Sequence, residues 1–238
     1  MKYFYLFLFI TISSSAFSQQ TVINDANAQV RSVTAFSGIK VSGGIDVYLS
    51  QGDDYSLAVS ASEDKYRDNI RTEVKNGILF IWFDNDHGGK NNGNKKLRVY
   101  LSFKTLESVE GSGASEITIN STLTSNSILV KLSGASDIKG SVKISNLSIE
   151  LSGASTITLN GSAENLKLDA SGASDIKNYD LEVENCVAKL SGASDVRLKI
   201  TGSITASASG ASTLYYEGDP ERKDIATSGA SSIGPKNN

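Results

Sequence analysis

The sequence predicts an all-β fold, namely a parallel, right-handed β-helix (a solenoid) with coils of about 19 residues, preceded by an irregular β N-terminal cap. Three observations lead to this prediction. The tetrapeptide Ser-Gly-Ala-Ser recurs at a near-constant period, apolar and polar residues alternate beside it, and the repeats lack the 3.6-residue periodicity of helices.

The tetrapeptide is interpreted as a tight corner between strands. Its seven copies begin at Ser112, Ser133, Ser152, Ser171, Ser191, Ser209 and Ser228, at spacings of 21, 19, 19, 20, 18 and 19 residues. Glycine adopts φ > 0 without a Cβ penalty, alanine fits a cramped interior, and serine can hydrogen-bond along the stack or to local backbone. The predicted structural turn glycines are Gly113, Gly134, Gly153, Gly172, Gly192, Gly210 and Gly229.

The residues on both sides of each corner have the pattern of short strands. Before the corner, a segment such as Leu147-Ser148-Ile149-Glu150-Leu151 alternates apolar and polar residues, which is typical of a half-buried strand. After the corner, one position is aliphatic in all copies: Ile117, Ile138, Ile157, Ile176, Val196, Leu214 and Ile233. A meander of hairpins fits less well, because Asn160-Gly161 is the only Asn-Gly or Asp-Gly turn in the repeat region.

Residues 1–18 have the pattern of a signal peptide, with Lys2, an apolar run and the small-x-small site Ala16-Phe17-Ser18. The apolar run is about half of the roughly 20 residues that a membrane-spanning helix needs. We therefore expect a secreted protein, in the periplasm, at the cell surface or outside the cell, with no membrane span after signal removal. The sequence leaves the oligomeric state open.

Residues 19–110 are expected to form a β region that caps and enters the solenoid, and residues 111–238 the repeat solenoid. Alternating runs predict strands at residues 30–36, 39–49, 55–60, 77–83 and 97–103. Ser60-Ala61-Ser62-Glu63 predicts a capping box that opens a short helix through about Asn69, and Asn76-Gly77 predicts a hairpin turn. Ser42-Gly43-Gly44-Ile45-Asp46 is a degenerate copy of the corner, so the solenoid can begin there.

Phe36–Leu49, Gly77–Ile81 and the Ser-Gly-Ala-Ser coils together resemble the bacterial family described as putative auto-transporter adhesin, head GIN domain. The resemblance covers nearly all of the chain after the signal peptide. It implies a secreted β-helical protein of Gram-negative-type bacteria.

Composition argues against several functions. Removal of the expected signal peptide, which contains Lys2, leaves 22 basic and 26 acidic residues. This slightly acidic balance argues against a nucleic-acid partner. Cys186 is the only cysteine and falls where other coils have Ile128 or Leu147, so it is expected in the core. His87, the only histidine, lies in a polar, glycine-rich segment, which argues against a Ser-His-Asp site. We expect no cofactor and no metal site.

The residue that directly follows each corner is the candidate position for cation binding or catalysis. It holds Glu116, Asp137, Thr156, Asp175, Asp195, Thr213 and Ser232. Asp175 and Asp195 lie on adjacent coils, about 5 Å apart at the spacing of paired strands, so they could hold a cation or act as a retaining-glycosidase pair. The simpler interpretation is that each is a solvated aspartate beside a turn.

The sequence thus favours a non-enzymatic adhesin or cell-envelope protein that binds a glycan or a cell-surface protein. Repetition favours binding, because active sites break repeats locally, and a polysaccharide lyase or glycoside hydrolase is the alternative. The candidate binding residues are Asp137, Asp175, Asp195, Tyr179, Tyr215 and Tyr216, with further aromatic candidates at Tyr48, Trp82 and Tyr100.

Overall fold

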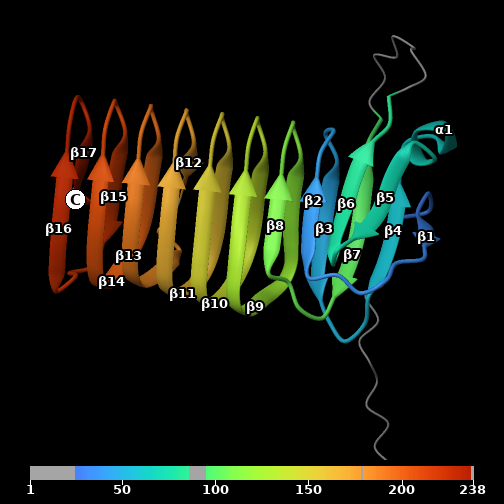
Figure 1. Ribbon diagram of the computed structural model, residues 1–238, viewed down its shortest axis with the longest axis horizontal. Helices are drawn as coiled ribbons and strands as arrows, with labels where there is room; N and C mark the ends of the chain where they lie inside the picture. The colour runs from blue at the N-terminus through green and yellow to red at the C-terminus, as the bar shows by residue number, and fades with distance from the viewer. Residues whose placement is uncertain (1–24, 86–94, 178, 237–238) are drawn as a thin grey trace, which may run out of the picture.

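The computed structural model describes residues 25–85, 95–177 and 179–236. These residues form one continuous sheet of 17 strands and one short helix, and the coils stack side by side along the long axis (Figure 1). The expected signal peptide and His87 lie outside the described residues. Within the part of the chain that the structure describes, no helix is long and apolar enough to cross a membrane.

The repeat region forms a continuous parallel stack, as predicted. Its strands are β9 (Glu116–Leu132), β10 (Asp137–Leu151), β11 (Thr156–Ala170), β12 (Asp175–Ile176), β13 (Leu181–Leu190), β14 (Asp195–Ala208), β15 (Thr213–Glu217), β16 (Arg222–Thr227) and β17 (Ser232–Pro235). In the pair β10–β11, Asp137 lies opposite Thr156 and Leu151 opposite Ala170, so equal positions of successive coils align. Between corners the chain is often one long bent strand, such as β10, rather than two short ones.

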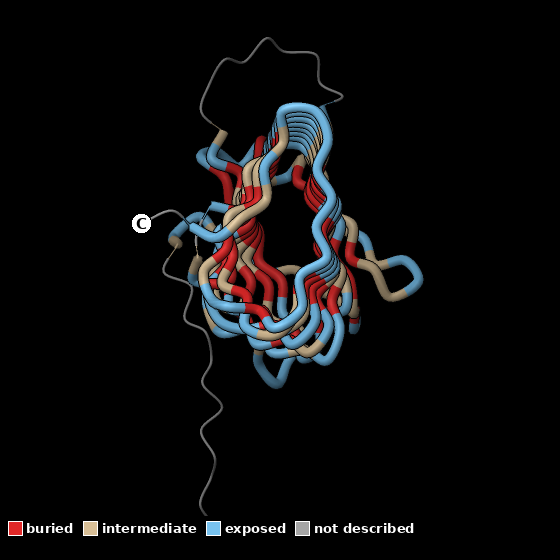
Figure 2. The backbone as a smooth tube through the Cα atoms, turned by 90° about the vertical axis from the view of Figure 1, so that its left-hand side faces the viewer, coloured by how far each residue is buried: buried red, intermediate tan, exposed pale blue. Residues whose placement is uncertain are grey.

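The corners lie in one row along an edge of the stack (Figures 1 and 2). In the corner that begins at Ser171, Gly172 has φ of 75° and the N–H of Ala173 donates to the carbonyl oxygen of Gly153 in the preceding coil, at 2.7 Å. The buried Ser174 donates its hydroxyl to the carbonyl oxygen of Ser171, at 2.8 Å. Serine is thus required at the fourth position because its hydroxyl satisfies a backbone carbonyl inside the corner.

Two constraints select glycine at the second corner position. Its positive φ is disfavoured for residues that carry a Cβ. In addition, a Cβ on Gly134 would lie 2.6 Å from the carbonyl oxygen of Gly113 in the coil below. The expectation for alanine was wrong: Ala135 and Ala154 are exposed at the tip of the corner, and the fourth-position serine points inward instead.

The N-terminal region contributes further coils, but in a different order from the sequence. Its elements are β1 (Gln29–Arg31), β2 (Gly38–Val41), β3 (Asp46–Gln51), β4 (Ser56–Ser60), α1 (Asp64–Arg67), β5 (Ile70–Lys75), β6 (Ile78–Phe83), β7 (Arg98–Phe103) and β8 (Ser108–Gly111). The coil β2–β3 is parallel to β6–β7 on one side and to β8–β9 on the other. The degenerate corner at Gly43 therefore stacks against Gly113, and the coil β6–β7 lies beyond it in the stack.

Antiparallel strands close this end of the stack and form the predicted cap. The hairpin turn at Asn76-Gly77 is confirmed, and the two residues have φ of 51° and 76°. The turn reverses the chain, so that β6 runs antiparallel to β5. Strand β4 runs antiparallel to β7, and β1 runs antiparallel to β4. The predicted capping box was wrong: Ser60 ends β4 and pairs with Arg98, and α1 begins only at Asp64.

The core consists of aliphatic columns inside the stack. Leu166, Cys186 and Ile204 lie opposite one another in successive coils, so Cys186 is a core residue as predicted. Burial raises the pKa of the Cys186 thiol to about 12, which leaves it protonated and unreactive near neutral pH.

Candidate binding surface

The outward side chains that follow each corner form two parallel columns, which we call the post-corner face. The first column contains Arg98, Asp46, Glu116, Asp137, Thr156, Asp175, Asp195, Thr213 and Ser232. The second column, two residues further on, contains Tyr100, Tyr48, Thr118, Lys139, Thr158, Lys177, Arg197 and Tyr215. Both columns point outward because the residue between them in each coil belongs to the core.

Asp175 and Asp195 lie opposite each other in adjacent coils. Each carboxylate has a cation from its own coil: Lys177 Nζ lies 3.9 Å from Asp175, and Arg197 Nη2 lies 2.9 Å from Asp195. The two carboxylates are thus individually neutralised rather than left as a free acidic pair. Asp137 is exposed and makes no ion pair within the described residues.

The N-terminal part of the face is denser in charge. Glu116 forms an ion pair with Lys139 of the next coil, and Asp46 lies opposite both Glu116 and Arg98. Burial, together with the charge of Glu116, raises the pKa of Asp46. Sequence reasoning missed Arg98 in this column, because no corner precedes it and only the strand order places it there.

Two tyrosines mark the N-terminal end of the face. The rings of Tyr48 and Tyr100 stack with centroids 5.1 Å apart and planes 17° apart. The hydroxyl of Tyr100 donates to the Asp25 carboxylate at 2.8 Å, and Arg98 lies 3.4 Å from the same carboxylate. Burial and the bond to Asp25 raise the pKa of Tyr100 to about 12. These contacts hold Asp25 against the N-terminal end of the post-corner face.

The C-terminal end of the face carries other candidate aromatic residues. Tyr215 is half-buried and lies opposite Arg197. Tyr179 is half-buried, and the ammonium of Lys236 lies 4.6 Å from its ring centroid. Tyr216 must be corrected: it is only 4 % exposed and packs in the core, because alternation along β15 places it on the opposite side from Tyr215. Trp82 is half-buried in β6 and lies in neither column of the post-corner face.

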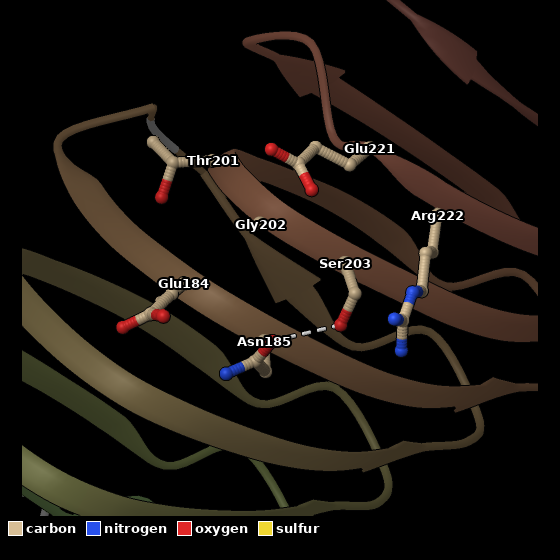
Figure 3. A pocket seen from close by; sticks show the side chains of 7 residues that line it. All are labelled: Glu184, Asn185, Thr201, Gly202, Ser203, Glu221 and Arg222. Carbon is tan, nitrogen blue, oxygen red and sulfur yellow. Dashed lines mark hydrogen bonds between the residues drawn. The ribbon is translucent and has the colours of Figure 1, made fainter.

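A polar recess lies at a bend of the coil away from the corners (Figure 3). Its lining residues are Glu184, Asn185, Thr201, Gly202, Ser203, Glu221 and Arg222, around a volume of about 460 Å³. It arises where the register between β13 and β14 shifts. A Cβ on Gly202 would lie 2.8 Å from the carbonyl oxygen of Glu184, so glycine allows the two strands to approach.

One side of this recess continues an asparagine ladder that sequence reasoning missed. Asn165 donates its amide to Asn146 at 3.1 Å, and Asn185 donates to Asn165 at 3.3 Å. The hydroxyl of Ser203 then donates to Asn185 at 2.8 Å, as the dashed line in Figure 3 shows. The recurrence of asparagine near the coil period was a signal in the sequence. The recess can exchange hydrogen bonds with a hydroxyl-rich ligand but offers no aromatic ring.

The described residues contain no group of three or more histidine, cysteine, aspartate or glutamate side chains that could hold a metal ion. The acidic column is interrupted by Thr156, and its carboxylates are largely paired with cations. The arrangement presents hydrogen-bonding groups at regular spacing.

Comparison with known proteins extends these observations. Residues 35–220 match the model of the family described as putative auto-transporter adhesin, head GIN domain. No curated protein matches the chain.

Several solved structures share the fold. A putative adhesin from Bacteroides fragilis is 23% identical with a TM-score of 0.79, over 88% of this chain and 96% of that chain. A putative lipid binding protein from Parabacteroides distasonis is 20% identical with a TM-score of 0.68, over 90% of this chain and 98% of that chain. A putative adhesin from Parabacteroides merdae is 16% identical with a TM-score of 0.65, over 88% of this chain and 95% of that chain.

Proposed function

The chain belongs to the family described as putative auto-transporter adhesin, head GIN domain, and on that premise we propose that it is an exported, non-enzymatic protein that binds glycan at the cell envelope. The ligand lies along the post-corner face. The observation that carries the proposal is the in-register repetition of polar side chains on this face, with half-buried tyrosines near both of its ends.

The chemistry of the face suits a hydroxyl-rich polymer. The pairs Asp175 with Lys177 and Asp195 with Arg197 supply acceptors and donors in two adjacent coils without a large net charge. Tyr215 beside this pair supplies an apolar ring surface and a hydroxyl, which is the usual combination for packing against a sugar. Because the coils repeat at the spacing of paired strands, the face can contact several units of one extended chain.

We do not propose lipid binding for this chain, although the similar protein from Parabacteroides distasonis is described as a putative lipid binding protein. In the described residues, the large apolar side chains that are exposed are Val30, Val187 and Ile225, which do not lie in either column of the post-corner face. A lipid-binding surface would need a contiguous apolar patch.

Glycan binding is tested with the chain from Gln19 onward on an array of bacterial and host polysaccharides. We expect Tyr215→Ala and Arg197→Ala each to weaken binding by about tenfold, the effect of losing roughly 1.4 kcal/mol of contact free energy. Lys189→Ala is the matched control, because this exposed lysine lies on the strand before the corner. Binding that is unchanged in both face variants would contradict the proposal.

The enzymatic alternative has a separate test. Polysaccharides incubated with the protein, with and without calcium, are expected to release neither reducing ends nor unsaturated sugars. Turnover that disappears in Asp175→Asn or Asp195→Asn would overturn the non-enzymatic proposal and assign the paired carboxylates a catalytic role.

A further inference from the structure

The carboxylate of Asp25 is bound by side chains from two other strands. The hydroxyl of Tyr100 donates to one of its oxygens at 2.8 Å, and Arg98 Nη1 lies 3.4 Å from the same oxygen. The hydroxyl of Ser60 is a third partner of this carboxylate, and only 12% of the Asp25 side chain is exposed. A guanidinium and hydroxyl groups that converge on one carboxylate are the donors that suit this anion.

The three donors continue the post-corner face. Ser60 lies opposite Arg98 in the antiparallel pair β4–β7, and Ala58 lies opposite Tyr100, so these residues of β4 extend the two columns. Ala58 and Ser60 are buried, although they lie on the outward side of the sheet. The bond between Asp25 and Ser60 places the segment of residues 25–31, which we call the N-terminal strap, against this part of the face.

The strap is attached by few contacts. Its strand β1 pairs with β4 through three residues and lies at the end of the stack (Figure 1). Val30 in the middle of β1 is 80% exposed, so the strap buries little apolar surface there. Arg31 holds the far end of the strap through the carbonyl oxygens of Ile70 and Arg67. A segment with few buried apolar contacts opens locally at a low cost in free energy, so Asp25 can move while Arg31 remains bound.

The charges beside the strap match a single carboxylate. Asp46 lies opposite both Arg98 and Glu116, and Glu116 forms an ion pair with Lys139. These four residues carry two positive and two negative charges, to which Asp25 adds one negative charge. A ligand carboxylate that replaces Asp25 therefore leaves the local balance of charge unchanged.

We propose that Arg98, Tyr100 and Ser60 form a binding site for the carboxylate of an acidic sugar, and that Asp25 occupies this site as an internal competitor. The inference rests on the proposed function and names the class of glycan. A sugar acid is favoured over a protein carboxylate because the site continues the post-corner face. In addition, the stacked rings of Tyr48 and Tyr100 adjoin it and can pack against a sugar.

The test uses isothermal titration calorimetry with oligogalacturonate and with its methyl ester, which has the same sugars without the charge. We expect Asp25→Ala, in the chain from Gln19 onward, to bind the free acid about tenfold more tightly than the unmodified protein does, because the competitor is gone. Binding of the ester is expected to stay the same. Asp53→Ala is the matched control, since it removes an exposed carboxylate between β3 and β4, outside both columns, and should leave both affinities unchanged.

The role of the guanidinium is tested by adding Arg98→Gln to Asp25→Ala. We expect the gain for the free acid to disappear, because the cation that pairs with the carboxylate is lost. Circular dichroism shows whether each variant is folded, and Asp25→Asn replaces Asp25→Ala if the latter does not fold. No gain in Asp25→Ala, an equal gain in Asp53→Ala, or an equal gain for the ester would overturn the proposal. Self-association of Asp25→Ala that Arg98→Gln abolishes would assign the site to a protein carboxylate and overturn the sugar as its ligand.

The carboxylate site and the proposed function can fail separately. If Tyr215→Ala weakens binding on the polysaccharide array but Asp25→Ala gains nothing for the free acid, only the carboxylate site is wrong. If the array shows no binding that depends on Tyr215 or Arg197, but Asp25→Ala binds the free acid through Arg98, the carboxylate site is supported and glycan binding along the whole face is wrong.

Discussion

The corners and the post-corner face occupy neighbouring positions of the same coils, yet they tolerate variation very differently. The corner repeats the same four residues seven times, whereas the first position after it changes among acidic residues, threonine and serine. Both regions stack in the same register. The difference is that backbone geometry dictates the corner, while solvent and ion pairs surround the face.

This difference separates the positions that set the shape of the coil from the positions that the fold leaves free to vary. At the corner, a positive φ and a close carbonyl oxygen leave room for glycine alone, and the buried serine satisfies the backbone locally. On the face, the side chains of the first column are partly or fully exposed and are acidic residues, arginine, threonine or serine in different coils, so the backbone of the coil accepts several polar residues there. If the face binds a ligand as proposed, its side chains can therefore change without loss of the solenoid.

The largest effect is expected when the corner backbone is disturbed. In Gly172→Val, a β-branched residue must adopt φ of 75° and its Cβ meets the carbonyl oxygen of Gly153. We expect the free energy of unfolding to fall by about 3 kcal/mol or more, measured by urea denaturation. Thr156→Val is the control on the face of a neighbouring coil, with an expected change within about 0.5 kcal/mol. Equal losses for the two variants would remove the distinction between corner and face.

A smaller effect is expected from the corner serine. Ser174→Ala removes the hydroxyl that donates to Ser171 and leaves a carbonyl oxygen with one partner fewer in a buried corner. The expected loss is about 1 kcal/mol of unfolding free energy. Ser171→Ala serves as the comparison, because its hydroxyl donates to Leu151 from a half-buried site that water can reach. A greater loss for Ser171→Ala than for Ser174→Ala would contradict the assigned role of the inward serine.

The smallest effect concerns a side chain of the face and appears only at high pH. The pKa of Tyr100 is raised from 10.0 to about 12, so the fold favours its neutral form. Its contribution to stability is complete below pH 10 and is lost as the pH rises from 10 to about 12. Denaturant unfolding across this range should show a shallower pH dependence in Tyr100→Phe than in the unmodified protein. Tyr48→Phe is the control, and an identical pH dependence for Tyr100→Phe and the unmodified protein would argue against the bond to Asp25.

Local patterns made much of the fold predictable. The period of the corner, the alternation beside it and the phase of Cys186 predicted a parallel stack with this thiol in its core, and the structure confirms each of these. The capping box was misassigned because pairing of Ser60 with Arg98 extends β4 through the expected helix start. A local motif does not report on a partner strand that lies elsewhere in the chain.

By itself, then, the sequence determined the coil, the corner and the identity of the core columns, because these depend on neighbours one coil away and repeat many times. Only the tertiary structure decided which coil lies beside which. It placed β6–β7 against β2–β3 and brought Arg98 beside Asp46, through pairings between segments that no shared period relates. The orientation of Tyr215 and Tyr216, in contrast, follows from alternation with the inward Leu214, so the sequence already contained the signal that Tyr216 is buried.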